Sequence, residues 1–247
     1  MKLLCLGDSV AVGCGLKSND EACAGNFARA AEKALGRPVS WEVVGKNGVT
    51  AKQIETKFVP KIGEWCDSKP DIIVLSVGVN NLLAMQSEAH FEKDLTQLLR
   101  SIVSKVDGHS SIVLMGMPPM SMFVALTPLL RKAAGYKAKQ FNQVMARVCE
   151  RFQAGSGGGT GSSRQVVHAD YQDSSIGLLE KLETESPASF FAPDGFHPGP
   201  KALQYMAEYF FEKSFAAKCT QLHSLVNDEH EDGGKKKILH RISFTKR

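Results

Sequence analysis

The sequence predicts an α/β domain in which helices cover both faces of a parallel sheet. Short apolar segments alternate with longer amphipathic segments over some 217 of the 247 residues. Two short segments, Ile72–Leu75 and Ile112–Met115, are apolar without interruption. Such runs are typical of strands that are buried on both faces of a parallel sheet. Strand–helix alternation of this kind indicates right-handed crossovers between parallel strands.

Five strands and five helices are expected in alternation. The strands are Leu3–Leu6, Trp41–Val44, Ile72–Val77, Ile112–Met117 and Val166–His168. The helices lie near residues 22–35, 51–64, 88–106, 128–152 and 199–217. The helix near 88–106 has the clearest period, because its apolar residues recur at i, i+3 and i+4 (Phe91, Leu95, Leu98, Leu99, Ile102 and Val106). Ligands of such sheets bind beyond the carboxyl ends of the strands, so a site is expected in the loops there.

Composition indicates an ordinary globular protein without special partners. Hydrophobic residues make up 43% of the chain and charged residues 23%, and the net charge is +4. This mild charge favours neither a nucleic acid nor a membrane as partner. No apolar run approaches the roughly 18 residues of a membrane span, and no secretory signal is visible at the start, so a cytoplasmic protein is expected. The six cysteines lack Cys-x-x-Cys or zinc-finger spacing and are expected to be reduced thiols.

Two segments stand apart from the alternating pattern. Residues 155–163 are rich in glycine and serine, and they are expected to form a surface loop. A phosphate-binding loop is not expected there, because the segment follows a helix and lacks the Gly-Lys-Ser/Thr ending. Residues 220–247 form a charge-segregated tail after a domain that is expected to span residues 1–219. We expect this tail to be solvated or packed on the domain, while contact with a membrane surface or a partner stays open.

Ser9 is the candidate nucleophile. Gly7-Asp8-Ser9 comes directly after the first expected strand, which places the serine at the mouth of the sheet with its hydroxyl free of the core. A turn serine that caps a helix is the alternative, since Asp and Ser are both favoured in such turns. Gly-Asp-Ser alone is therefore weak evidence for a nucleophile.

Asp194 and His197 are the candidate partners of that nucleophile. A hydroxyl is a poor nucleophile at neutral pH and needs a base to take its proton, normally a neutral imidazole. The imidazole needs a carboxylate that fixes its tautomer and stabilises the imidazolium. Asp and His three residues apart can share one turn and reach each other directly. A capping Asp beside a surface His is the alternative interpretation.

Asn80 and Gly48 are candidate hydrogen-bond donors to an oxyanion. Asn80 follows the third expected strand, and an asparagine amide donates without competing as an acid or base. Gly48 follows the second strand, where a glycine exposes its backbone N–H and lets a ligand approach closely. Asparagines at such positions usually bind turn backbone, and Asn-Gly is a common turn. However, all of these candidates converge on one edge of one sheet.

In this order, the motifs resemble those of the SGNH hydrolases, also called GDSL esterases. The matching residues are Gly7-Asp8-Ser9, Gly48, Gly78-Val79-Asn80 and Asp194-Gly195-Phe196-His197, and the resemblance spans residues 3 to about 217. It is closest to small intracellular bacterial-type members. The resemblance implies a three-layer flavodoxin-like α/β/α sandwich with a five-stranded parallel sheet. It also implies hydrolysis of esters or thioesters with no metal and no cofactor.

The resemblance also implies a role for each site residue. Ser9 would attack to form an acyl-enzyme, His197 would act as base and then acid, and Asp194 would orient His197. The backbone N–H groups of Ser9 and Gly48, with the Asn80 side chain, would form the oxyanion hole. The family usually has an aspartate where this chain has Asn81. Asparagine keeps the size but loses the charge, so we expect an effect on local rigidity more than on catalysis.

Other classes of function find less support in the sequence. The nucleophile elbow Gly-x-Ser-x-Gly of α/β-hydrolases is absent, as are the zinc-protease, dinucleotide and Walker patterns. The remaining alternative is a binding module that holds an acyl or sugar group on the same fold without turning it over. The expected partner is a small-molecule ester substrate, with no nucleic acid and no transmembrane segment.

The loops that border the site leave the substrate open. Residues 117–127 and 171–193 are expected to flank it, and the first loop is rich in apolar residues (Met117, Met120, Met122, Phe123 and Leu126). They suggest a surface for an acyl chain, in which Met supplies adaptability. Ordinary packing under a loop explains them equally well. A short-chain ester, a lysophospholipid, an acyl thioester and an acetylated sugar all remain candidates.

Overall fold

A parallel five-stranded sheet forms the centre of the molecule. The computed structural model describes residues 1–64, 69–106, 110–123, 125–154, 166–171 and 186–215. The strands are β1 (Lys2–Gly7), β2 (Ser40–Gly45), β3 (Ile72–Ser76), β4 (Ser111–Met115) and β5 (Val166–Ala169). They are all parallel, in the order β2-β1-β3-β4-β5. Each expected strand is present, and its ends lie within two residues of the expected bounds.

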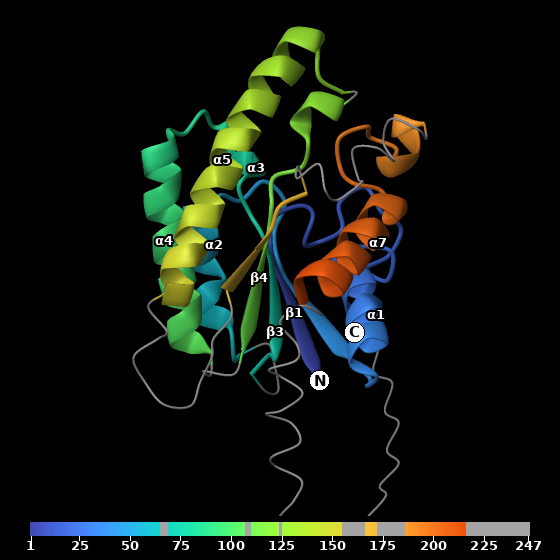
Figure 1. Cartoon of the computed structure of the whole chain (residues 1–247), viewed down its shortest axis with the longest axis vertical. Coiled ribbons are helices and arrows are strands. Elements are labelled where there is room, and N and C mark those ends of the chain that lie inside the picture. Colours follow the sequence, from blue (N-terminus) through green and yellow to red (C-terminus); the bar gives the residue numbers. More distant parts are fainter. Residues whose placement is uncertain (65–68, 107–109, 124, 155–165, 172–185, 216–247) are drawn as a thin grey trace, which may run out of the picture.

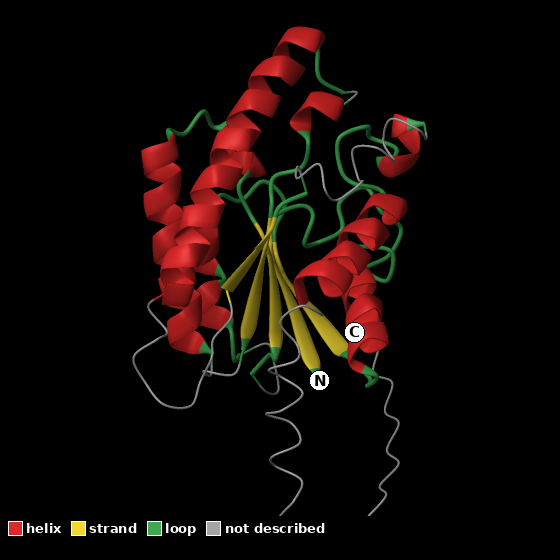
Figure 2. Ribbon diagram, in the orientation of Figure 1, coloured by secondary structure: helices red, strands yellow, loops and turns green. Residues whose placement is uncertain are grey.

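Helices cover both faces of this sheet. One face packs against α1 (Cys23–Leu35) and α7 (Pro200–Tyr209), and the other against α2 (Ala51–Lys57), α4 (Glu88–Lys105) and α5 (Pro128–Ala154) (Figures 1 and 2). The shorter helical elements are η1 (Val59–Lys61), α3 (Val79–Leu83), η2 (Met120–Met122), η4 (Pro187–Phe190) and η5 (Phe210–Phe215). The expected α/β/α sandwich is confirmed.

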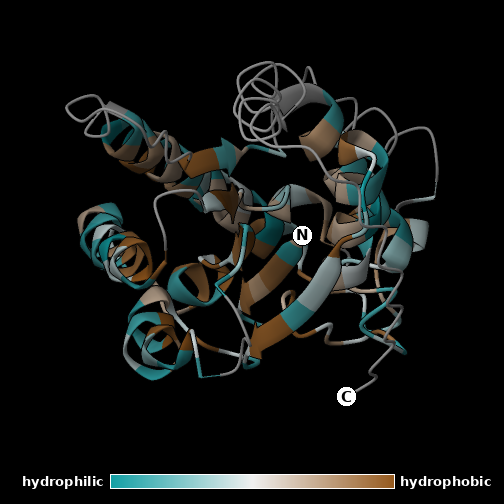
Figure 3. Ribbon diagram, turned by 90° about the horizontal axis from the view of Figure 1, so that it is seen from below, coloured by the Kyte–Doolittle hydropathy of each residue, from teal (hydrophilic) through white to brown (hydrophobic). Residues whose placement is uncertain are grey.

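The apolar strands divide their side chains between two cores. Every residue of β3 and β4 is buried. Leu75 and Leu114 pack into the core beneath α2, α4 and α5, whereas Val74 and Val113 pack into the core beneath α1 and α7. Apolar colour accordingly concentrates on the strands and on the inward sides of the helices (Figure 3). Burial on two sides is the reason why these strands show no polar alternation.

Two expected helices differ from the structure, and one short helix was not expected. The helix near 51–64 ends at Lys57, and a 3₁₀ turn over Val59–Lys61 follows. Pro60 explains this end, because proline has no N–H to donate and disfavours α conformation in the residue before it. The last helix is regular only to Tyr209 and continues as a π-helix over Phe210–Phe215. The five-residue α3 was not expected, since it is too short to show a helical period.

Two predictions fall outside the described residues. The glycine-rich segment 155–163 and the tail 220–247 are not described, so the domain boundary at residue 219 stays a prediction. Among the described residues, no helix is long and apolar enough to cross a membrane.

The order of the strands creates a switch point at β1. The chain leaves β1 for β2 through α1 and then crosses to β3 on the opposite side of β1 through α2. Gly7 at the end of β1 therefore lies between Gly45 of β2 and Ser76 of β3. Loops diverge at such a point and leave a crevice at the carboxyl ends of the strands. Ser9, Gly48 and Asn80 lie in the three segments that follow these strands.

Candidate active site

Ser9 lies in a tight turn that begins where β1 ends. Gly7 has a φ of 146°, and a Cβ on this residue would overlap the carbonyl oxygen of Ser76. Only glycine fits so close to β3. The N–H of Asp8 donates to that same carbonyl oxygen at 3.2 Å, and the N–H of Cys14 donates to the Ser9 carbonyl at 2.9 Å. These backbone bonds hold Ser9 just beyond the sheet, with 8% of its surface exposed.

Asp8 is a buried carboxyl group directly before Ser9. Its Oδ1 accepts hydrogen bonds from Ser76 Oγ at 2.7 Å and from the Val10 N–H at 3.1 Å. Burial raises the pKa of Asp8 to about 6, although both hydrogen bonds and the nearby His197 act in the opposite direction. Asp8 therefore binds a proton more tightly in the folded chain than in the unfolded chain.

This raised pKa gives the replacement Asp8→Asn a pH-dependent effect on stability. The folded pKa of about 6 exceeds the unfolded value of 3.8, so the native chain loses stability as the pH rises through 6. Asparagine resembles the protonated carboxyl and escapes this loss. At pH 7.5 we expect the variant to be more stable by about 3 kcal/mol, and the difference to shrink to about 0.5 kcal/mol at pH 4. Urea denaturation of both proteins at pH 4, 5, 6 and 7.5 measures this, and a pH-independent difference would contradict the buried charge.

A closed loop carries Asp194 and His197 to the same edge of the sheet. Phe191 and Pro198 form an antiparallel bridge, and the Ala192 N–H donates to the His197 carbonyl oxygen at 2.8 Å. Gly195 turns the chain between them with a φ of 67°, a left-handed conformation that favours glycine. The loop then enters α7 through Gly199 and Pro200. The short closed turn expected from the Asp-x-x-His spacing is present.

Asp194 holds the His197 ring with a direct hydrogen bond. Its Oδ2 lies 2.6 Å from His197 Nδ1, and its Oδ1 accepts the N–H groups of Phe196 and His197, both at 2.9 Å. Partial burial raises the pKa of Asp194, but the hydrogen bonds from the His197 ring and from the two backbone groups outweigh it and lower the pKa to about 2. Asp194 is therefore ionised at neutral pH and fixes the orientation of the ring. His197 Nδ1 is occupied by this bond, which leaves Nε2 as the nitrogen that can exchange a proton with another group.

Ser9 and His197 line one cavity of about 80 Å³. Apart from Ser9, Ser76, His197 and Gly116, its walls are apolar (Val10, Val77, Val79, Met115, Met117, Pro118, Pro119, Phe123, Phe190, Phe191, Phe196, Pro198, Ala202 and Met206). Of the apolar residues expected at the site, only Met117 and Phe123 line this cavity. Met120 is fully buried, and Met122 and Leu126 pack on the cores. Packing thus accounts for Met120, Met122 and Leu126, while Met117 and Phe123 border the cavity.

Gly48 and Asn80 lie in neighbouring segments, beyond the ends of β2 and β3. Asn80 Nδ2 donates to the carbonyl oxygen of Val49 at 3.0 Å, which ties α3 to the loop that contains Gly48. An amide nitrogen carries two hydrogens, so one remains for a ligand. Gly48 is exposed, and a Cβ on it would meet nothing within 4 Å, so there is room for a ligand over its N–H. Neither residue lines the apolar cavity, so these donors lie apart from it.

Comparison with known proteins identifies the family. The profile of the GDSL-like Lipase/Acylhydrolase family matches residues 5–156. The chain belongs to this family. No curated protein matches the sequence. This membership makes the chain an ester hydrolase of the GDSL/SGNH kind, and the expected family and enzyme class are confirmed.

Solved structures share the fold at low sequence identity. LAE5, an alpha/beta hydrolase enzyme from the metagenome of Lake Arreo in Spain, has a TM-score of 0.62 and 18% identity, over 87% of this chain and 95% of that one. The psychrotrophic esterase EstA from Pseudoalteromonas sp. has a TM-score of 0.56 and 14% identity, over 92% and 98%. AlinE4, a SGNH-hydrolase family esterase, has a TM-score of 0.54 and 17% identity, over 91% and 95%.

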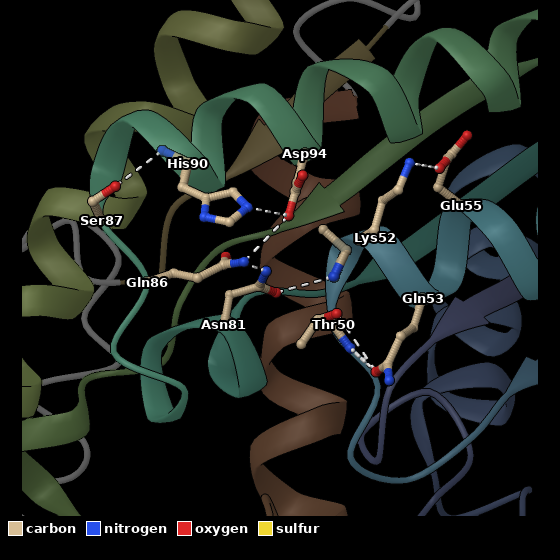
Figure 4. A network of polar contacts seen from close by, with 10 residues as sticks. Thr50, Lys52, Gln53, Glu55, Asn81, Gln86, Ser87, His90 and Asp94 are labelled. Atoms are coloured by element: carbon tan, nitrogen blue, oxygen red, sulfur yellow. Dashed lines mark hydrogen bonds and ion pairs between the residues drawn. The ribbon is translucent and has the colours of Figure 1, made fainter.

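Asn81, where GDSL enzymes usually have aspartate, is the centre of a buried chain of hydrogen bonds (Figure 4). Its side chain is fully buried. Its Oδ1 accepts the N–H of Ala51 at 3.1 Å, and its Nδ2 donates to Gln86 Oε1 at 2.7 Å. Gln86 Nε2 then donates to Asp94 Oδ2 at 3.2 Å, and His90 Nε2 lies 3.6 Å from the same oxygen. The amide joins α2, α3 and α4, so local order at this position does not depend on a charge.

The direction of these bonds predicts that Asn81→Asp destabilises the protein. A carboxylate cannot donate to Gln86, which would have to turn its amide and present its oxygen to the Asp94 carboxylate. We expect a loss of about 2–4 kcal/mol in the free energy of unfolding. Adding Asp94→Asn should restore much of it, because the chain of donors then runs in the opposite direction. Urea denaturation of the single and double variants tests this, and equal stability of Asn81→Asp and the native chain would contradict it.

Sequence reasoning found only part of one wall of the cavity. Phe190 and Phe191 belong to the segment 171–193 that was expected to flank the site, whereas Phe196, Ala202 and Met206 lie beyond it, near His197 and in α7, which meet the β4 loop only in the folded chain. The signal that could have found part of this wall is the cluster of three phenylalanines on either side of Asp194. Asp8 was also missed as a titrating group, since its burial depends on the packing of β3.

Proposed function

We propose that this chain hydrolyses carboxylic esters through a Ser9-His197-Asp194 triad and an acyl-enzyme intermediate. The observation that carries the proposal is the bond of 2.6 Å between His197 Nδ1 and Asp194 Oδ2, on a ring that lines the same cavity as Ser9. With Nδ1 engaged, Nε2 is the atom that can take the Ser9 proton. The family determines the class of reaction, and these three side chains are proposed to carry it out.

In the first half of the reaction, Ser9 Oγ attacks the carbonyl carbon of the ester while His197 takes its proton. The resulting tetrahedral oxyanion accepts hydrogen bonds from the N–H groups of Ser9 and Gly48 and from Asn80 Nδ2. Collapse of this intermediate breaks the bond to the alcohol oxygen, which receives the proton from His197. The acyl group remains on Ser9 as an ester.

In the second half, water replaces the alcohol. His197 takes a proton from the water as its oxygen attacks the acyl carbon, and the same donors stabilise the second oxyanion. The carboxylic acid leaves when the bond to Ser9 Oγ breaks and His197 returns the proton to that oxygen. Asp194 stays ionised throughout, since its pKa is about 2, and it stabilises the imidazolium that forms in each half.

Asn80→Ala tests the proposed oxyanion hole. We expect kcat to fall by about 10²–10³-fold with little change in KM, because the lost hydrogen bond forms mainly in the transition state. The variant also loses the bond to the Val49 carbonyl oxygen, so the melting temperature must be measured beside the kinetics. If the activity fell only in proportion to the fraction of folded protein, Asn80 would instead be a structural residue.

The apolar cavity favours the acyl group of the ester as its occupant. Aromatic and methionine side chains border Ser9 and His197 directly, where the acyl chain of a bound ester begins. A sugar would leave its hydroxyl groups without partners against such walls. We therefore propose esters or thioesters of unbranched acyl chains as substrates, ahead of acetylated sugars.

A panel of p-nitrophenyl esters from C2 to C16, run beside acyl-CoA and acetylated sugars, tests this choice. We expect kcat/KM to rise as methylenes are added to the acetyl group, since each buried methylene contributes about 0.8 kcal/mol. The chain length at which the rise stops measures the depth of the cavity. A maximum at C2, or a preference for acetylated sugars, would exclude the cavity as an acyl site.

A further inference from the structure

The first turns of α5 project beyond the carboxyl edge of the sheet, at the end of the molecule where Ser9 lies (Figure 1). One side of this projection is anchored. A Cβ on Gly135 would lie 3.2 Å from Ser121 Cβ, Arg131 Nε donates to the Leu126 carbonyl oxygen at 2.7 Å, and Ala138 is buried. The anchored side rests on η2 and the segment after it, which also supply part of the cavity wall.

The opposite side of this projection is apolar and basic. Leu129, Leu130 and Tyr136 are 78%, 55% and 68% exposed, and Lys132 and Lys139 are exposed between and beyond them. At helical spacing, Leu129, Lys132, Tyr136 and Lys139 form one stripe toward solvent, and the exposed Leu130 lies beside its first residue. The other large apolar side chains exposed in the described part of the chain are Leu83 and Met85, at the end of α3, which packs against α5.

The charge of this region is one-sided. Residues 108–149 contain five basic side chains and no aspartate or glutamate (Arg131, Lys132, Lys137, Lys139 and Arg147). That segment thus carries +5 in a chain whose net charge is +4, so the rest of the chain sums to −1. A solvated helix usually balances its exposed charges with i, i+4 partners of opposite sign, and the start of α5 has none.

We propose that the exposed stripe of α5 is a docking surface for an anionic phospholipid bilayer. Leucine and tyrosine side chains interleaved with lysine are the combination that enters the headgroup region of a bilayer while the ammonium groups meet lipid phosphates. Arg147 is paired with Glu92 and Arg131 faces the anchored side, so the charge offered to a partner is that of Lys132 and Lys139, and anionic lipid is its complement. An apolar patch that is exposed in this way marks an interaction site, and the lysines within it favour an anionic partner.

Docking through this stripe would bring the carboxyl edge of the sheet, where the active site lies, toward the lipid surface. The segment between β4 and α5 lines the cavity with Met117, Pro118 and Phe123 before the chain turns into the projecting helix. This role rests on the proposed function, in which the cavity receives an acyl chain. An ester that resides in the bilayer would then lie near the end of the molecule that contains Ser9.

Vesicle binding by the full chain tests the surface. Ser9→Ala serves as the parent, so that hydrolysis does not alter the lipid, and co-sedimentation is measured with phosphatidylcholine vesicles with and without 30% phosphatidylglycerol. We expect binding only to the anionic vesicles. Lys132→Gln/Lys139→Gln should weaken it roughly 30-fold, since each basic residue near such a surface contributes about fivefold. Leu129→Gln/Leu130→Gln should weaken it as well.

A matched control separates the stripe from general charge. Lys93 and Arg100 are exposed on α4 at the same i, i+7 spacing, so Lys93→Gln/Arg100→Gln removes the same charge from another helix. We expect this control to bind anionic vesicles nearly as well as the parent. Equal losses in the two charge variants, or no vesicle binding at all, would overturn the proposal. Unchanged binding in both α5 variants would overturn it too and would move lipid binding elsewhere, for instance to residues 220–247.

Activity in the Ser9-intact chain distinguishes this proposal from the proposed function. The α5 variants should turn over a soluble short-chain ester at the native rate and should hydrolyse an ester embedded in anionic vesicles more slowly. Loss of both activities would show that the stripe is needed for the folding of the active site, and it would overturn the docking role. If the chain formed a dimer that Leu129→Gln/Leu130→Gln dissociates, and did not bind vesicles, the stripe would instead be a contact surface for a second copy of the chain.

Discussion

Ser9→Ala is expected to lower kcat for ester hydrolysis by about 10⁴–10⁶-fold while the protein stays folded. The loss is large because no acyl-enzyme can form without Oγ, and only the oxyanion donors and substrate binding remain to accelerate attack by water. The fold should persist, since the turn is held by backbone bonds that alanine keeps, such as that from the Cys14 N–H to the Ser9 carbonyl. Kinetics with the best ester of the panel, beside a thermal melt, measure both effects.

The control for this prediction is the combination of Ser9→Ala with His197→Ala. If Ser9 and His197 act as a unit, each single variant loses about as much as the double variant. Independent roles would instead make the losses multiply. A Ser9→Ala variant that keeps more than a few per cent of native activity would rule out Ser9 as the nucleophile.

Asp194→Asn is expected to lower kcat by about 10³–10⁴-fold, the second largest effect. Asp194 accepts three hydrogen bonds, from the His197 ring and from two backbone N–H groups. An asparagine can accept on one oxygen only and turns an N–H₂ group either to the ring or to the backbone donors. If it donates to Nδ1, the His197 proton moves to Nε2, and the ring can no longer take the proton of Ser9.

The pH dependence of activity provides a check on the role of Asp194. The pKa of this carboxyl is lowered to about 2, so its interactions are present above the unfolded value of 3.8 and are lost as the pH falls toward 2. Asp194 should therefore cause no change in kcat between pH 5 and pH 9. If the kcat of Asp194→Asn stayed within tenfold of the native kcat across this pH range, Asp194 would not have the orienting role.

Local features of the sequence were sufficient to predict the sheet and the candidate triad. The strands were recognisable because β3 and β4 are buried on both faces and carry only apolar residues. Asp194 and His197 could be proposed as a pair because a separation of three residues lets both side chains share one turn. Ser9 was a candidate because a turn directly after a strand of a parallel sheet lies at its functional edge, and the convergence of the other candidates on that edge supported it.

Features that depend on distant packing could not be predicted. The cavity wall formed by Phe196 and Met206 requires the contact between the segment before α7 and the loop after β4. The order around Asn81 depends on Gln86, which precedes α4, and on Asp94 in α4, and these residues meet only in the folded chain. The five residues of α3 are ordered by these contacts rather than by a helical period, so Asn80 was expected at a strand end instead of in a helix.

Labelling with a fluorophosphonate probe tests the central claim most directly, because the probe bonds covalently only to an activated serine. The account predicts that the native chain is labelled at Ser9, as located by peptide mass analysis, and that labelling disappears in Ser9→Ala and in His197→Ala. A folded native chain that remains unlabelled would contradict it and would favour a module that binds an acyl group without cleaving its ester.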